Sequence, residues 1–175
     1  MNNLQTTRLI LRPFVQEDLP KVFEGLSHPQ VIAHYGISYE SLEKTQEQMD
    51  WFKSIEEKET GLWRAIIRKD DFEFLGAIGI NNRNIEHKNA ELGYWLLPHF
   101  WRQGYLLEAG LYFCDKIFKH YDLHRLEAQV ETENRSSIKT IEALGFRYEG
   151  TKRDCELKNY NWISLAIYGK IVPLS

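Results

Sequence analysis

The chain has 175 residues, of which 43% are hydrophobic and 27% are charged, a composition typical of a soluble globular domain. Its formal net charge of −3 argues against the basic face that direct nucleic-acid binding requires. No run approaches the roughly 18 apolar residues of a membrane span, and the first residues do not have the pattern of a signal peptide. We therefore expect a single domain over residues 1–175, in the cytoplasm, with no membrane or nucleic-acid partner.

The reactive side chains do not suggest a metal site. The two cysteines, Cys114 and Cys155, lack metal-ligand spacing, so we expect reduced thiols. The histidines also show no metal or triad spacing. We expect no metal.

The first third of the chain combines one strand with two helices. Residues 8–14 alternate apolar and basic side chains and predict a strand, and residues 16–26 predict a short helix. Pro29 and Gly36 interrupt the next segment. A second helix is expected over residues 41–59, because one face is marked by a repeating set: Leu42, Thr45, Met49, Phe52 and Ile55.

The remaining elements alternate strands with helices. A helix should begin at Gly104, because its apolar stripe has helical spacing: Leu107, Leu111, Cys114, Phe118 and Tyr121. Residues 136–144 predict another helix. Strands are expected at residues 62–68, 72–81, 90–97, 125–130, 146–153 and 162–171.

This order predicts an α/β domain with a mixed, mostly antiparallel sheet of about seven strands and helices on both faces. The helix from Gly104 would cross over between two parallel strands. Because ligands favour the carboxyl ends of strands joined in this way, the segment "PHFWRQGYLLEAG" lies at a candidate site.

That segment ends a strand at Pro98 and starts a helix after Gly104. The first turn of a helix leaves amide N–H groups without intrahelical partners and can bind an anion, although a glycine before a helix is also common architecture. A second segment, "NRSSIKTIEALGF", starts a helix at Asn134 and ends it at Gly145, as an N-cap and a C-cap would. Ser137 near its start could donate a proton to a leaving group.

In this order, the two segments resemble the GNAT superfamily of acetyl-CoA dependent N-acetyltransferases. The family's pyrophosphate motif falls on "WRQGYL" and its later helix motif on "NRSSIKTIEALGF". The stretches "TTRLILRPF", "AELGYWLLP" and "FWRQGYLLEA" look most like the Rim-type branch, which acetylates N-terminal amines of ribosomal proteins. The resemblance implies the acyl-CoA N-acyltransferase fold, with a splayed central sheet.

The resemblance also implies a cofactor site. The edge formed by Trp95, Leu96 and Leu97 would pair with the pantetheine arm of acetyl-CoA, and Asn134 would contact the cofactor through its amide. The pyrophosphate would lie on the residues of the helix start: Arg102, Gln103, Gly104, Tyr105, Leu106 and Leu107. The chain departs from the family at Leu106, where glycine or alanine is usual, and at Trp101, where arginine or glutamine is usual.

For the chemistry, the resemblance implies Ser137 as the acid that protonates the leaving thiolate. Glu91 is the candidate base, with Glu127, Gln129 and Glu131 or water as alternatives. The first helical pair would line the acceptor pocket with His34, Tyr35 and Trp51.

The expected function is direct transfer of an acetyl group from acetyl-CoA to a primary amine, most simply the N-terminus of a ribosomal protein. Two alternatives remain: a small-molecule amine as the acceptor, or a non-catalytic CoA-binding domain. The branch also suggests a homodimer.

Overall fold

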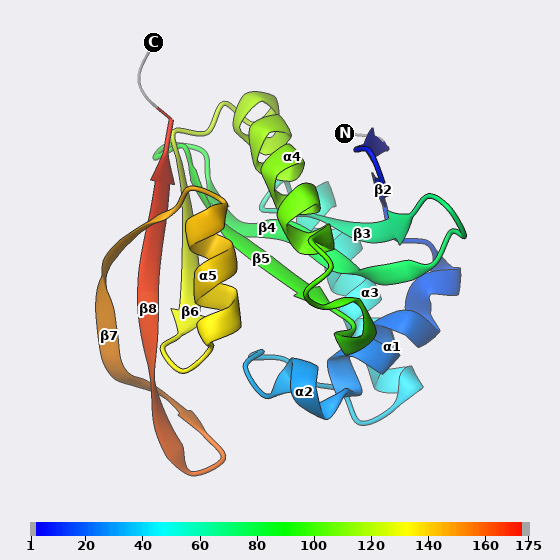
Figure 1. The fold of residues 1–175 in the computed structure, drawn as a ribbon, viewed down its shortest axis with the longest axis horizontal. Helices are drawn as coiled ribbons and strands as arrows, with labels where there is room; N and C mark the ends of the chain where they lie inside the picture. Colours follow the sequence, from blue (N-terminus) through cyan, green and yellow to red (C-terminus); the bar gives the residue numbers. More distant parts are fainter. Residues whose placement is uncertain (1–2, 173–175) are drawn as a thin grey trace.

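The computed structural model describes residues 3–172, which form one eight-stranded sheet in the order β1-β2-β3-β4-β5-β6-β8-β7 (Figure 1). The strands are β1 (Leu4–Gln5), β2 (Leu9–Arg12), β3 (Leu62–Arg68), β4 (Phe74–Asn84), β5 (Asn89–Leu96), β6 (Arg125–Glu131), β7 (Arg147–Lys158) and β8 (Asn161–Ile171). The α-helices are α1 (Leu19–Ser27), α2 (Pro29–Ile32), α3 (Leu42–Glu57), α4 (Tyr105–His120) and α5 (Arg135–Ala143). Two 3-10 turns, η1 (Gln16–Asp18) and η2 (Pro98–Phe100), precede α1 and α4.

The sheet is mixed and mostly antiparallel, which confirms the predicted fold class. Only β5 and β6 run parallel, and α4 is the crossover between them. The sequence predicted about seven strands; the additional one is β1, whose two residues pair with Leu11 and Ile10. Two residues are too few to display the alternation on which a strand prediction depends.

The pair β5–β6 is the unusual part of the sheet. The two strands pair only from Asn89 to Glu91 and from Arg125 to Glu127. Beyond that point β5 continues along β4, whereas β6 continues along β8. The sheet therefore splits into two halves, and a gap opens between the carboxyl ends of β5 and β6.

Helices cover both faces of the sheet, as predicted. Helices α4 and α5 lie on the face turned to the viewer in Figure 1, whereas α1 and α3 pack against the other face, on β4 and β3. The central strands carry fully buried side chains such as Leu11, Ile66 and Ile78. The core thus fixes the positions of both strands that border the gap.

Several element boundaries differ from the predictions: β2 is shorter than residues 8–14, β4 is Phe74–Asn84 rather than residues 72–81, and two further differences have a clear physical reason. The predicted helix over residues 16–26 is a 3-10 turn followed by α1, with buried Asp18 at the junction, where it accepts two bonds from the Arg12 guanidinium (2.7 and 2.8 Å). Strand β7 continues to Lys158 rather than stopping at residue 153. Because nearly all of β7 is exposed, its length has no alternating pattern in the sequence.

Two tryptophans are held tightly where the gap meets the α1/α3 face. The Trp63 ring lies against Gly79 and Gly93, where an added Cβ would come within 2.2 and 2.7 Å of it. The Trp95 ring lies against Gly25 of α1 in the same way, at 2.1 Å. Both rings are buried, so neither has room to move.

We predict that Gly25→Ala lowers the free energy of unfolding by about 2 kcal/mol, because the new methyl group overpacks against Trp95. Gly36→Ala is the matched control, since no atom lies within 4 Å of its added Cβ. Urea unfolding of both variants measures the difference. Equal stability of the two variants would contradict the packing described for Trp95.

Candidate functional site

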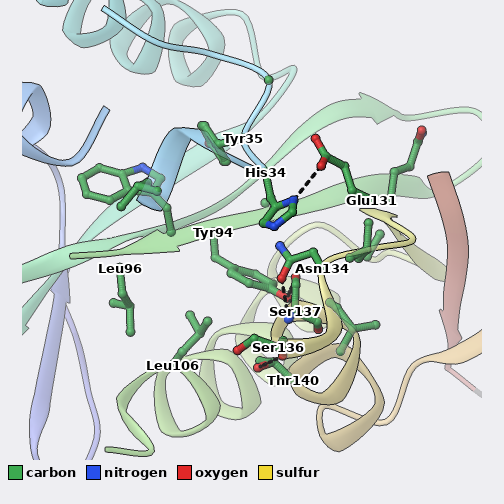
Figure 2. A pocket seen from close by; sticks show the side chains of 18 of the residues that line it. His34, Tyr35, Tyr94, Leu96, Leu106, Glu131, Asn134, Ser136, Ser137 and Thr140 are labelled. Carbon is green, nitrogen blue, oxygen red and sulfur yellow. Dashed lines mark hydrogen bonds and ion pairs between the residues drawn. The ribbon is translucent and has the colours of Figure 1, made fainter. Parts of the chain in front are cut away.

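The gap opens into a cavity of about 1200 Å³ that both halves of the sheet line. Its walls come from the segment after α2, β5 and β6, the starts of α4 and α5, and the end of β7. Figure 2 shows side chains of these elements converging on the cavity. Residues far apart in the chain therefore meet at the place where the sheet divides.

One wall is the start of α4. Gly104 has φ 77° and precedes the helix, and Arg102 has φ 60°, so two residues in the left-handed region shape the turn. The first helical bond joins the Glu108 N–H to the Gly104 carbonyl (3.0 Å). The N–H groups of Tyr105, Leu106 and Leu107 precede that bond, and all three residues line the cavity. This wall therefore offers free amide donors and the positive end of a helix dipole.

The N-terminal segment holds this helix start in place. The Glu108 carboxylate accepts bonds from the Thr6 hydroxyl (2.6 Å), the Arg8 amide (2.8 Å) and the Arg8 guanidinium (2.6 Å). Arg8 also donates to the Gln103 carbonyl (3.1 Å). Burial raises the pKa of Glu108, but these donors outweigh it and the pKa is lowered overall.

The opposite wall is the edge of β5. The N–H of Leu97 donates to the Leu75 carbonyl on β4 (2.8 Å). Because neighbouring residues of an antiparallel strand direct their backbone groups to opposite sides, those of Leu96, Tyr94 and Leu92 point toward the gap. The Leu96 carbonyl there accepts the indole N–H of Trp101 (2.8 Å). The backbone groups of Tyr94 and the Leu96 N–H thus present a free edge to the cavity, beyond the last β5–β6 pair, Glu91 with Glu127.

The start of α5 carries a polar cluster. The side-chain oxygen of Asn134 accepts the N–H of Ser137 (3.1 Å), which makes Asn134 the N-cap and leaves its amide nitrogen unbonded among residues 3–172. The Ser137 hydroxyl lies 2.7 Å from the Tyr94 hydroxyl. Burial raises the pKa of Tyr94 to about 12, so this phenol stays protonated near neutral pH.

On the α1/α3 side the cavity is lined by carboxylates and aromatic rings. Glu91 accepts a bond from the Asn82 side chain (3.0 Å). Burial raises the pKa of Tyr35, and the nearby Tyr39 and Glu91 add to the effect. Trp51 packs edge-on against Trp63 at 6.2 Å between ring centroids.

The structure brings most of the predicted site residues together. The cavity is lined by His34, Tyr35, Trp51, Glu91, Trp95, Leu96, Arg102, Gly104, Tyr105, Leu106, Leu107, Asn134 and Ser137. Two are not part of the lining: Leu97 is bonded to β4, and the Gln103 side chain donates to the His99 carbonyl (2.9 Å). Among the other base candidates, Gln129 and Glu131 line the cavity, whereas Glu127 pairs with Arg125 (3.0 Å).

The sequence analysis did not predict that Tyr94 and Lys158 belong to the site, nor that Arg8 forms an ion pair with Glu108. A signal existed for Tyr94: alternation along β5 turns it away from the Glu91 face, toward the helix that carries Ser137. The partners of Lys158 and Arg8 lie on distant elements, and the sequence contains no spacing that would reveal them.

Two further findings limit the chemistry of the described residues. In this part of the chain, 3–172, no group of His, Cys, Asp and Glu side chains is arranged to hold a metal ion. Cys114 is fully buried on α4, and burial raises its pKa to about 12, so it is not available as a nucleophile.

No helix among residues 3–172 is long and apolar enough to cross a membrane.

We predict that Glu108→Gln lowers stability near neutral pH by about 1–2 kcal/mol, since it removes a charged hydrogen-bond acceptor. Because the folded-state pKa of Glu108 is lowered, its contribution is complete above the ordinary glutamate pKa of about 4.3 and is lost as pH falls through the folded value. Urea unfolding from pH 7 to pH 3 should show the variant and the wild type converging in acid. A difference that persists unchanged at pH 3 would contradict this role; exposed Glu86→Gln is the control.

The comparisons with known proteins agree with this geometry. The family described as "Acetyltransferase (GNAT) domain" matches residues 8–147. The chain is 30% identical over 171 residues to the uncharacterized N-acetyltransferase YoaA of Bacillus subtilis, which covers 97% of both chains. It is 32% identical over 157 residues to the uncharacterized N-acetyltransferase p20 of Bacillus licheniformis, covering 89% of this chain and 88% of that one.

A solved structure has the same fold. RimL, described as a ribosomal L7/L12 alpha-N-protein acetyltransferase in complex with coenzyme A, superposes with a TM-score of 0.88 at 18% identity, covering 98% of both chains. With the family match over most of the chain, these findings establish that the protein belongs to the GNAT acetyltransferase family.

Proposed function

We propose that the protein transfers the acetyl group of acetyl-CoA to a primary amine, both substrates being bound together in the cavity. One observation carries the proposal: the free backbone edge of β5 faces the same cavity as the free amides at the start of α4. An extended amide-containing chain fits the first, and a pyrophosphate fits the second.

The residues present fit acetyl-CoA. The pantetheine arm would pair with the backbone groups of Tyr94 and with the Leu96 N–H. The pyrophosphate would accept bonds from the amides of α4, with Arg102 as a countercharge. Leu106 is compatible with this role because the backbone, not the side chain, supplies the donors. Trp101 in place of arginine or glutamine holds the turn against β5 through the Leu96 carbonyl.

Acetyl-CoA supplies an acetyl group activated as a thioester. The pair Ser137 and Tyr94 would deliver a proton to the departing thiolate, Ser137 directly and Tyr94 by a bond to the Ser137 hydroxyl. The raised pKa of Tyr94 keeps its proton available at neutral pH. Positioning both hydroxyl groups on rigid elements, α5 and β5, fixes the direction of the transfer.

The acceptor amine must lose a proton before it attacks the carbonyl carbon. Glu91 is our candidate for the group that receives it, directly or through water, since its carboxylate lines the acceptor side of the cavity. Its bond to Asn82 holds the carboxylate in place. Trp63 and Trp95 lie buried beside it and shape this side of the cavity.

For the acceptor we propose the N-terminal amine of a protein, with a ribosomal protein as the first candidate. The support is the shared fold and whole-chain coverage with RimL, whose acceptor is ribosomal L7/L12. The unpaired state of Cys114 and Cys155 suits a reducing cytoplasm. Small amines remain the alternative acceptor.

The test is an acceptor screen with purified protein and acetyl-CoA. Peptides with different first residues, polyamines and amino acids are compared by thiol release and by the mass of the products. The α-amine of at least one class of peptide should gain the mass of one acetyl group. Tight CoA binding without acetylation of any amine would instead indicate a non-catalytic binding domain.

We predict that Ser137→Ala lowers kcat about 10²-fold while the affinity for CoA changes less than about threefold, as expected for loss of a general acid. Tyr94→Phe should also lower kcat, and the double variant should be no worse than Ser137→Ala, because the two hydroxyl groups act as one unit. Ser137→Thr keeps a hydroxyl and should retain more activity than alanine. An unchanged kcat for Ser137→Ala would remove Ser137 from the mechanism.

A further inference from the structure

A glutamate, a lysine and a histidine from separate elements meet at the outer end of the gap. Glu131 ends β6, Lys158 ends β7, and His34 follows α2. The Glu131 carboxylate lies 2.7 Å from His34 Nδ1 and 2.9 Å from Lys158 Nζ. Figure 2 shows His34 and Glu131 directed toward each other above Asn134 and Ser137. All three residues line the cavity.

The Lys158 ammonium is bound by three oxygens. Besides the Glu131 carboxylate, it contacts the carbonyls of Ala33 (2.7 Å) and Tyr35 (3.4 Å). An ammonium group has three N–H donors and no acceptor, so this set matches its chemistry. The cavity wall therefore contains a preformed ammonium site, and in this structure the protein's own lysine occupies it.

The burial of the partners favours exchange of the lysine for another cation. The Glu131 side chain is only 12% exposed, so its charge needs a positive partner to remain withdrawn from water. Lys158 is 24% exposed and has a long side chain beside the hairpin turn at residues 159–160, so its ammonium can move into solvent when another cation takes its place at these oxygens.

The position of Glu131 is where an acceptor would arrive. Glu131 lies four positions after Glu127, which is the last β6 residue paired with β5. It is therefore about 13 Å along the strand from the point where the two halves of the sheet part. It projects from the same side of β6 as Glu127, which is paired with Glu91, so it shares the acceptor face of the sheet with the candidate base.

We propose that Glu131, together with the Ala33 and Tyr35 carbonyls, binds the ammonium group of the incoming acceptor, and that Lys158 is a built-in competitor for the same oxygens. The inference rests on the proposed function and narrows its substrate to amines that arrive protonated. N-terminal and alkyl amines meet this condition, with pKa values of about 8 and above 10.

The experiment compares Glu131→Gln and Lys158→Met by steady-state kinetics with both substrates. Glu131→Gln should raise the KM for the acceptor about tenfold, the effect of losing one charged hydrogen bond, and leave the KM for acetyl-CoA within about twofold. Lys158→Met should lower the KM for the acceptor several-fold because the competitor is gone. The double variant should behave as Glu131→Gln does, and Lys152→Met, exposed on the same strand and outside the cavity lining, should behave as wild type.

A result in which Lys158→Met raises the acceptor KM as much as Glu131→Gln does would overturn the proposal and reduce the cluster to a structural brace. An unchanged KM for Glu131→Gln would overturn it as well. Thermal unfolding of each variant shows whether it is folded.

A binding measurement separates this inference from the proposed function. Calorimetric titration of n-butylamine into the CoA-saturated protein should show binding to Lys158→Met that is tighter than to wild type and is absent in Glu131→Gln. That pattern supports the ammonium site even when no acceptor is acetylated, whereas equal binding to all three proteins contradicts the site even when acetylation occurs.

Discussion

The separation of β5 from β6 after three residue pairs is the constraint on which the rest of the site depends. A parallel pair that continued would occupy the backbone groups of Tyr94 and the Leu96 N–H and close the space between the sheet halves. Because the pairing stops, β5 keeps a free edge, and the crossover helix α4 begins beside that edge. One continuous cavity therefore joins the α1/α3 side of the sheet to the side of α4 and α5. Cofactor and acceptor can then approach the same point from opposite faces of the sheet.

Such a gap is costly unless other contacts hold its borders. On the side of α4, Thr6 and Arg8 bind Glu108, so the segment between β1 and β2 is tied to the first turns of the crossover helix. On the acceptor side, Trp63 and Trp95 lock β4, β5 and α1 together over glycines that leave room for their rings. At the mouth, Lys158 and His34 connect the halves through Glu131, and both side chains are partly open to water.

The sequence predicted the features that depend on residues close together in the chain, such as helix spacing and helix caps. The caps Asn134 and Gly145 follow from capping chemistry, and the structure has both. The predicted stripe of α4 is only partly confirmed: Cys114 and Phe118 are buried, whereas Leu111 is 49% exposed. Contacts between distant elements were out of reach: Glu131 was only one of several candidate bases, and nothing in its surroundings indicates that Lys158 and His34 converge on it. The length of β7 was missed for a related reason, since a strand exposed on both faces shows no alternation. Tyr94 lies between these cases, because alternation gives its face of β5 but not its 2.7 Å contact with Ser137.

The central claim is that the β5 edge and the start of α4 together bind CoA. Amide hydrogen exchange with and without CoA, followed by mass spectrometry on overlapping peptides, tests it most directly. Binding should slow exchange at residues 92–96 and at residues 105–107, and should leave residues 147–153 of the exposed strand β7, which lie outside the cavity lining, unchanged. Slower exchange at only one of the two segments, or at neither, would contradict the claim that a single ligand spans them.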